Sequence, residues 1–296
     1  MHGVVQASSD AAGMPSEAVL ALHNRREIYD DFEAFQPRLA ALLHEGSQLD
    51  DAIELTRTLG ILEPFTRAHI PAEAIEIQGP NYRESLIANG LPSRNRAVLV
   101  VLEMLYGSLQ ELGKLDVYLV EALTGFAAWL KQQVGNGRLT CSEYLEDAEL
   151  SCEEITHQDL CALSFAKASF DLVICNELFE HVQDLDLACR EVARVLKGGG
   201  RLVATCPLAF GQKQSIMKAI YDASTGSSKL LMEAERHGDP VRPESGSLVY
   251  RIPGWEVLEQ LQRAGFSKAR MHHITSWKHG VLGSDLPGVL VIDAER

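Results

Sequence analysis

The chain has little of what would mark it as a membrane protein or a nucleic-acid-binding protein. A membrane-spanning helix needs about eighteen consecutive apolar residues. No apolar run in this sequence of 296 residues approaches that length. The first residues lack a basic segment ahead of an apolar one, so they do not predict a secretory signal peptide. The formal net charge of −14 argues against a phosphate backbone as the main partner, although a local pocket can still bind an anion. We expect a cytoplasmic protein with no membrane span and no nucleic-acid partner.

Cysteines are few and do not form a pattern. The six cysteines are irregularly spaced and include no CxxC pair. Most of them stand among apolar residues, where a cysteine behaves as a small hydrophobic side chain. The sequence therefore predicts neither a disulfide framework nor a zinc–cysteine site.

Glycine is scarce at the one turn where a nucleotide-binding α/β protein would concentrate it. The stretch DVYLVEALTGFAAWL (116–130) predicts a buried strand, a turn and a helix, but the turn EALTG contains a single glycine, Gly125. A nicotinamide-dependent dehydrogenase needs GxGxxG there, since glycines let the backbone come close to the ligand. Its absence argues against that class of enzyme.

An alternation of strands and helices fills the rest of the chain. Strand–helix alternation predicts a parallel sheet with helices on both faces. The sequence KGGG (197–200) directly follows the predicted helix 185–196 and predicts the C-terminal end of that helix. The predicted strands are 115–121, 138–142, 153–158, 170–176, 201–206, 269–274 and 288–292, and the predicted helices are 97–112, 126–134, 185–196 and 255–264.

The N-terminal third has a different character. Residues 16–67 carry apolar side chains at three- and four-residue steps, which is typical of helices. Residues 70–96 are punctuated by proline and glycine and predict an irregular connector. This connector contains Arg83, Arg94 and Arg96, for which we expect a solvated or helix-capping role.

Polar side chains stand at the predicted carboxyl ends of successive strands. These are Glu121, Glu143, Asp159 and Asn176. In open parallel sheets, ligands bind outside the carboxyl ends of the strands. Glu143 follows Glu121 at about the twenty-residue spacing of an acid that holds ribose hydroxyls. The pattern favours a cofactor site, although each residue alone could be an ordinary turn residue.

The run HQDLCALSFAKASFDLVICNELFEHVQDLDLACREVARVLKGGGRLVATCP (157–207) resembles the core of class I S-adenosylmethionine-dependent methyltransferases, in the type 11 branch. The Asp-Leu pair, the segment NELFEHV and the segment REVARVLKGGGRLV match together. The resemblance is close over about 115–207 and loose beyond. It implies S-adenosylmethionine as the cofactor and a doubly wound, mostly parallel seven-stranded, Rossmann-like α/β sheet with an N-terminal helical region. We predict that residues 1–96 form this region and its connector, and that 97–296 form the methyltransferase domain, with a substrate or lid insert at about 207–251.

The resemblance also implies roles for the residues at the strand ends. Glu143 would hold both ribose hydroxyls of the cofactor. Asp159 would accept a hydrogen bond from the adenine amino group, and the backbone N–H of Leu160 would meet the adenine ring. Asn176 would help to fix the methionine end.

The turn EALTG departs from the family pattern. Glu121 and Gly125 match it, whereas Leu123 replaces a glycine. We expect a modified but working cofactor loop in which Thr124 and Gly125 keep the turn and Leu123 points into the core. The alternative is a non-catalytic binding or scaffold protein that has lost the cofactor.

Candidate catalytic residues follow the fourth strand of the core and recur in the insert. His181 is the first candidate for a general base, because an imidazole titrates near neutral pH, and Glu177 is the second. A capping or packing role for His181 stays open. His237, within ERHGDP (235–240), is a further candidate on a polar lid. The expected acceptor is an oxygen, the hydroxyl of a small molecule or a glycan; the glycan is suggested only by a loose likeness of the RESL segment (83–86) to type 11 members associated with cell-surface glycans.

The spacing Glu177-x-x-Glu180-His181 is also similar to the metal-binding motif of ubiquinone-pathway O-methyltransferases. Two carboxylates and an imidazole could hold a divalent ion. Many type 11 relatives carry the spacing without an established metal role, so the sequence alone assigns no metal ligand. It names neither the acceptor nor the oligomeric state.

Overall fold

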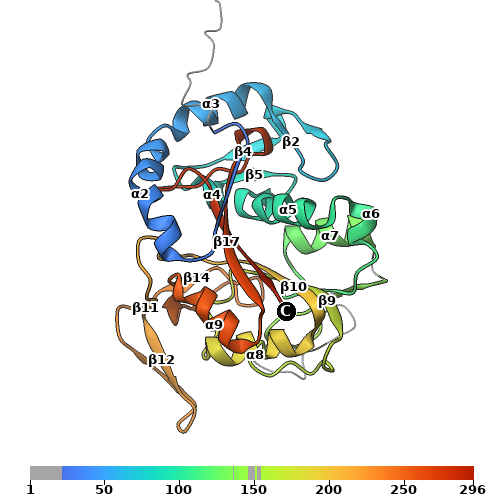
Figure 1. The fold of residues 1–296 in the computed structure, drawn as a ribbon, viewed down its shortest axis with the longest axis vertical. Helices are drawn as coiled ribbons and strands as arrows, with labels where there is room; N and C mark the ends of the chain where they lie inside the picture. The colour runs from blue at the N-terminus through green and yellow to red at the C-terminus, as the bar shows by residue number, and fades with distance from the viewer. Residues whose placement is uncertain (1–21, 136, 146–150, 152–154) are drawn as a thin grey trace, which may run out of the picture.

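A seven-stranded sheet forms the centre of the fold (Figure 1), with the strand order β1-β17-β18-β10-β9-β7-β8. The computed structural model describes residues 22–135, 137–145, 151 and 155–296. The strands are β1 (Arg25–Tyr29), β7 (Val117–Leu119), β8 (Leu139–Cys141), β9 (Phe170–Asn176), β10 (Leu196–Thr205), β17 (Lys268–Thr275) and β18 (Val289–Glu295).

The sheet is mixed. The strands β8, β7, β9 and β10 pair with their neighbours in parallel, whereas β18 pairs antiparallel with β10 and β17, and β1 pairs antiparallel with β17. Five strands therefore run in one direction, and β18 and β1 run against them. The predicted Rossmann-like sheet is confirmed. Most strands point the same way, as predicted, but the three strand pairs between β1 and β10 are antiparallel. A hydrophobic run carries no information on strand direction, so the sequence did not predict this reversal.

Helices cover both faces of the sheet, because the side chains of each strand alternate between them. On β9, Leu172 and Ile174 pack with α5 and α7, whereas Val173 and Cys175 pack with α8 and α9. Burial on both faces explains why β9 is a continuous apolar run in the sequence. These helices are α5 (Ser93–Tyr106), α7 (Gly125–Val134), α8 (Leu185–Val195) and α9 (Glu256–Ala264).

The predicted elements of the C-terminal part agree well with the structure. Three of the four predicted helices match α7, α8 and α9 within one residue. The fourth is divided into α5 and α6 (Leu109–Leu112) at Gly107, which has a φ of 76°. The KGGG segment is not a separate turn, because β10 already begins at Leu196 and only shifts its register against β9 before Arg201.

The predicted strand 153–158 is described only in part. Its first two residues lie outside the described residues, as does the start of the predicted helical region at residue 16. His157 forms an isolated parallel bridge with Glu143, next to β8. The chain therefore continues the parallel side of the sheet at this point.

The N-terminal region contains helices and also a strand that the sequence did not predict. The helices α2 (Phe32–Gly46) and α3 (Leu49–Leu59) confirm the helical periodicity, but β1 joins the edge of the main sheet. Its sequence RREIY is mostly charged, which hides the strand pattern. Arg25 and Glu27 form ion pairs with α2, and Arg26 forms one with Glu103 of α5. The division of the chain at residue 96 stays a prediction. The shorter elements that follow are β2 (Ile61–Leu62), β3 (His69–Ile70), η1 (Ala72–Ala74), β4 (Ile75–Ile77), α4 (Tyr82–Ser85), β5 (Leu86–Ala88) and β6 (Leu91–Pro92).

Arg96 is fully buried, so the prediction of a solvated or capping role is wrong for this residue. Its guanidinium donates hydrogen bonds to the backbone carbonyls of Leu86, Leu91, His279 and Gly280. Carbonyl oxygens satisfy the buried donors. The arginine thus fastens the segment of β5 and β6 to the chain that leads into β18.

The insert between β10 and α9 is built from short paired strands. The hairpin of β12 and β13 projects from the body of the molecule (Figure 1). Among the described helices, none has the length and apolar character needed to cross a bilayer. The five cysteines in the described part of the chain are all free, as expected. The insert strands are β11 (Ile216–Met217), β12 (Ala219–Asp222), β13 (Ser227–Leu230), β14 (Arg236–His237), β15 (Ser247–Leu248) and β16 (Arg251–Ile252).

One buried carboxylate ties three strands of the sheet together. Asp293 of β18 accepts hydrogen bonds from Arg201 of β10 at 2.7 Å, and from Arg270 and His272 of β17 at 3.2 Å each. Burial by itself would raise the pKa of Asp293, but the hydrogen bond from His272 and the charge of Arg201 outweigh it and lower the pKa to about 2.

We predict that Asp293→Asn lowers the free energy of unfolding by about 3 kcal/mol at neutral pH, because it removes one partner of a buried charged group. The folded-state pKa of Asp293 is depressed, so its contribution is present above the unfolded-state pKa of roughly 4 and is lost as the pH falls toward about 2. Urea titrations at several pH values should therefore show the difference between wild type and variant narrowing in acid. A difference that stays constant from neutral pH down to about pH 2 would contradict this account.

Candidate active site

A cavity of about 660 Å³ lies at the carboxyl ends of β7, β8 and β9. Its inner wall consists of residues that follow these strands, such as Val120 after β7, and its outer wall comes from the insert, including Ser228 and Tyr250. The volume suits a ligand of the size of a nucleoside cofactor. The strand ends thus form a real pocket, as their polar side chains predicted.

Four of the seven predicted cofactor residues lie together in the wall of this cavity, namely Glu143, Asp159, Leu160 and Asn176. Oε1 of Glu143 accepts hydrogen bonds from two backbone N–H groups of the EALTG turn, at 2.8 and 3.0 Å. Within the described part of the chain, Oε2 of Glu143 has no hydrogen-bond partner, so it can accept from a ligand. Asp159 similarly uses Oδ1 to accept from the backbone N–H of Cys161 at 2.8 Å.

The other three predicted cofactor residues do not line the cavity. Glu121 is buried and accepts a hydrogen bond from the side chain of Asn176 at 2.7 Å, and burial raises the pKa of Glu121. Thr124 caps α7 by accepting from a backbone N–H. A Cβ on Gly125 would lie 2.4 Å from the carbonyl oxygen of Gly90, so this glycine lets the N-terminal segment pack on the loop. These three residues support the wall, and contact with the cofactor stays a prediction for them.

The prediction that Leu123 points into the core is wrong, because its side chain is 44% exposed. Its backbone N–H is directed at Glu143, together with that of Ala122. The turn is therefore held by the carboxylate of Glu143 and not by burial of the leucine.

A second cavity, of about 680 Å³, adjoins the first. The two cavities share Glu177, His181, Arg236 and Gly238 in their walls. The remaining wall of the second cavity is partly apolar and partly charged, and includes Arg83, Glu84, Arg94, Phe210, His237 and Leu286. A ligand in one cavity can therefore meet a ligand in the other at the turn that follows β9.

Glu177 is held firmly in this shared wall. Its backbone has a φ of 52°, an unusual value for a glutamate, and its N–H donates to the carbonyl of Thr205. Both carboxylate oxygens accept from the guanidinium of Arg83, at 2.5 and 3.0 Å. Burial by itself would raise the pKa of Glu177, but the charges of Arg83 and Arg94 lower it to about 2. A carboxylate of such low basicity accepts protons poorly at neutral pH, which argues against the predicted role of Glu177 as a base.

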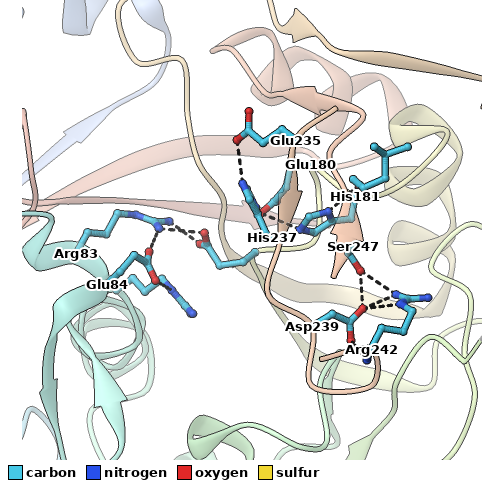
Figure 2. Close-up of polar contacts among 12 residues, drawn as sticks. Arg83, Glu84, Glu180, His181, Glu235, His237, Asp239, Arg242 and Ser247 are labelled. Carbon is cyan, nitrogen blue, oxygen red and sulfur yellow. Dashed lines mark hydrogen bonds and ion pairs between the residues drawn. The ribbon is translucent and has the colours of Figure 1, made fainter. Parts of the chain in front are cut away.

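Arg83 and Arg94 form a small network of ion pairs behind this wall, of which Figure 2 labels Arg83 and Glu84, so the prediction that the two arginines are solvated or capping is wrong. Glu84 accepts hydrogen bonds from both arginines, at 2.8 Å from Arg94. The three side chains come from α4 and α5, and they connect the N-terminal segment to Glu177. Sequence reasoning missed their function, although the cluster of arginines in one connector was the available signal.

A carboxylate and two histidines face one another beside the same wall (Figure 2). His181 Nε2 and His237 Nδ1 each lie 3.6 Å from Oε1 of Glu180. The other nitrogens are fixed, since His181 Nδ1 lies 2.9 Å from the carbonyl oxygen of Leu248 and His237 Nε2 lies 3.1 Å from a carboxylate oxygen of Glu235. Burial raises the pKa of Glu180. The two predicted catalytic histidines are thus brought together. Glu180 was named in the sequence only as part of the Glu177-x-x-Glu180-His181 spacing, and Glu235 was not predicted as a site residue.

The insert is fixed over both cavities by its own contacts. The backbone N–H of Tyr250 donates to the carbonyl of Glu180 at 2.8 Å. Asp239 accepts from Arg242 at 2.9 Å and from Ser247 at 2.5 Å, and the Arg242 guanidinium lies 5.7 Å from the ring centre of Tyr144, after β8. The insert is therefore braced by polar contacts, as Figure 2 shows around Asp239, and its role as a lid stays a prediction.

Comparison with known families agrees with this arrangement. A family model described as a methyltransferase domain matches residues 105–204, which contain β7, β8, β9 and β10. Residues 105–204 therefore carry a methyltransferase domain of the type 11 kind. S-adenosylmethionine is the cofactor that this resemblance implies.

Solved structures resemble this chain at low identity. An S-adenosylmethionine-dependent methyltransferase from Mesorhizobium loti is 18% identical over 64% of this chain and 95% of its own, with a TM-score of 0.39. The 1,6-didemethyltoxoflavin-N1-methyltransferase of Burkholderia thailandensis, with bound S-adenosylhomocysteine, is 16% identical over 68% and 77%, with a TM-score of 0.38. A possible histamine N-methyltransferase from Thermotoga maritima is 14% identical over 69% and 97%, with a TM-score of 0.36. No curated protein matches the chain. These scores are too low to transfer a substrate to this chain.

We predict that Glu143→Ala weakens binding of S-adenosylhomocysteine by at least about tenfold in isothermal titration calorimetry. Hydrogen bonds to a charged group contribute roughly 1.5–3 kcal/mol, and this variant also releases the EALTG turn. Glu143→Gln keeps one acceptor oxygen for the turn, so it should weaken binding of S-adenosylhomocysteine less than Glu143→Ala does. Glu111→Ala, at an exposed glutamate of α6, is the matched control. An unchanged dissociation constant in Glu143→Ala, with an intact fold by circular dichroism, would mean that the ribose binds elsewhere.

We also predict strong coupling between Arg83 and Glu177. In a double-mutant cycle of Arg83→Met and Glu177→Gln, followed by urea unfolding, the coupling energy should be about 1–3 kcal/mol, since each single change removes the two charged hydrogen bonds that join these side chains. The exposed pair of Arg57 and Glu54, at 2.8 Å, is the control and should couple by about 0.5 kcal/mol or less. Equal coupling in the two pairs would show that the Arg83 pair is merely a surface contact.

Proposed function

We propose that this methyltransferase transfers the methyl group to an oxygen, the hydroxyl of a small molecule or of a glycan. The observation that carries the proposal is the shared wall of the two cavities, where His181 lies beside Glu177 and next to His237. One cavity would hold the cofactor and the other the acceptor. The methyl group would cross where they meet.

The cofactor fits the first cavity in one orientation. The free oxygen of Glu143 would accept from the ribose, and Asp159 and Leu160 would contact adenine. Asn176, at the end of β9, would lie near the methionine part. The sulfur would then approach the turn of Glu177 and His181, with its methyl group directed at the second cavity.

Methyl transfer is an in-line displacement. The acceptor oxygen forms a bond to the methyl carbon, the carbon–sulfur bond breaks, and its electron pair returns to the sulfur, which becomes neutral. The protein contributes mainly proximity and orientation. The hydroxyl must also lose its proton, and the cluster of Glu180, His181 and His237 is the nearest group of acceptor atoms on the wall of the second cavity.

The second cavity offers both polar and apolar wall to an acceptor. Of its three arginines, Arg83 and Arg94 are paired with Glu177 and Glu84, and Arg236 donates to the backbone carbonyls of Ser245 and Gly246. Phe210 and Leu286 supply an apolar wall for the body of the acceptor. A hydroxyl on a small molecule or sugar meets both conditions.

We predict that a metabolite or glycan extract incubated with cofactor labelled with ¹³C on its methyl group will yield a product with a methoxy carbon signal by NMR. Once an acceptor is known, His181→Ala and His237→Ala should each lower turnover by roughly 10²–10⁴-fold, the range of a lost proton-transfer group. His44→Ala, at an exposed histidine on α2, should turn over like wild type.

Three results would contradict the proposal. A label on nitrogen or carbon would refute the oxygen acceptor, and near-full turnover of both histidine variants would remove the cluster from the reaction. No detectable heat with S-adenosylhomocysteine at concentrations on the order of 1 mM, well above typical substrate affinities, would favour the alternative of a scaffold protein that has lost the cofactor.

A further inference from the structure

The buried carboxylate of Glu180 is unusual because carboxylates are rarely found in a protein interior without a partner. It is 0% exposed, and among the described residues neither of its carboxylate oxygens has a hydrogen-bond partner. Burying a carboxylate without a partner is costly, so such groups are normally paired or bind a metal. The two closest nitrogens, on His181 and His237, lie at 3.6 Å, beyond normal hydrogen-bond distance.

The tautomers of both histidines follow from their other contacts. The carbonyl of Leu248 can only accept, so the hydrogen of His181 is on Nδ1 and its Nε2 presents a lone pair. The carboxylate of Glu235 likewise accepts from His237 Nε2, so a neutral His237 has its lone pair on Nδ1. With both imidazoles neutral, two lone pairs and a carboxylate oxygen converge on one point, and a metal cation or a shared proton between them makes this arrangement favourable.

We propose that Glu180, His181 and His237 bind a divalent cation of the Zn²⁺ type. The three ligand atoms all lie within 4.8 Å of one another. Two ligands about 2.1 Å from a tetrahedral zinc ion are about 3.4 Å apart, close to the 3.6 Å between Oε1 of Glu180 and each imidazole nitrogen. The contacts from Leu248 and Glu235 are the outer hydrogen bonds that metal-binding histidines usually make.

The ligand set differs from the one that the Glu177-x-x-Glu180-His181 spacing suggests. Arg83 occupies both oxygens of Glu177, which removes that carboxylate from the cluster. The third ligand comes instead from His237 on the lid, 56 positions after His181 in the chain. The cation would therefore fasten the lid to the turn that follows β9.

Three protein ligands leave one position open, which is the arrangement of catalytic zinc sites. His181 and His237 both line the second cavity, so that position faces the acceptor. The catalytic role rests on the proposed function. With their lone pairs on the cation, the histidines would no longer take the proton; the cation would instead polarise the acceptor hydroxyl, whose proton would pass to solvent water before the oxygen attacks the methyl carbon and the sulfur keeps the electron pair of the broken bond. Binding of the cation does not depend on that role.

Zinc binding is tested directly on the full chain, after dialysis against a chelator and without cofactor or acceptor. Calorimetry with ZnCl₂ should show one site per chain, and Co²⁺ should give the visible absorption of a low-coordinate nitrogen and oxygen site. His237→Ala and Glu180→Gln should each weaken Zn²⁺ binding by more than about 100-fold, and Glu235→Gln by about 10–100-fold. Glu177→Gln and His44→Ala should stay within a few-fold of wild type.

The absence of Zn²⁺ and Co²⁺ binding by the folded wild type would overturn the inference, because a shared proton would then be what holds the cluster together. Loss of binding in Glu177→Gln, with retention in His237→Ala, would overturn it in favour of the ligand set that the sequence spacing suggests. Zinc binding together with a methyl label on nitrogen or carbon would uphold the metal site and refute the oxygen acceptor. A methoxy product formed at full rate by metal-free enzyme would leave the proposed function standing and refute the catalytic role of the cation.

Discussion

The pairing of Arg83 with Glu177 is the interaction on which the rest of the site depends. A largely buried carboxylate at a positive φ needs a fixed counter-charge, and Arg83 supplies it with two hydrogen bonds. The arginine lies outside residues 105–204, which match the methyltransferase domain. The chain therefore builds the carboxyl end of β9, the central strand of the site, with a side chain from its N-terminal segment.

The two cavities follow from this constraint. With Glu177 fixed, the turn after β9 becomes a wall with one cavity on each side. The strand ends of the core line the first cavity, and the N-terminal segment and the insert complete the second. His237 of the insert then meets Glu180 and His181 of the core, which assembles the polar cluster from two distant parts of the chain.

The sequence predicted what depends on local pattern. β9 was found as an apolar run buried on both faces. Glu143, Asp159 and Asn176 lie in one cavity wall because parallel strands end at one edge, and their contact with a cofactor stays a prediction. Contacts between distant residues were not predictable. The partners of Arg83 lie up to 94 residues away, the charges of β1 mask an edge strand, and Leu123 faces solvent because Glu143 holds the turn by its backbone. That the buried carboxylate of Glu180 has no hydrogen-bond partner among the described residues can be recognised only in the folded structure.

A crystal structure with S-adenosylhomocysteine tests the central claim most directly, namely that cofactor and acceptor occupy separate cavities that meet at Glu177 and His181. We expect the ribose beside Glu143, the adenine beside Asp159, and the sulfur directed at the shared wall, with the second cavity left open for the acceptor. A ligand that occupies the second cavity, or a sulfur directed away from Glu177 and His181, would contradict the account.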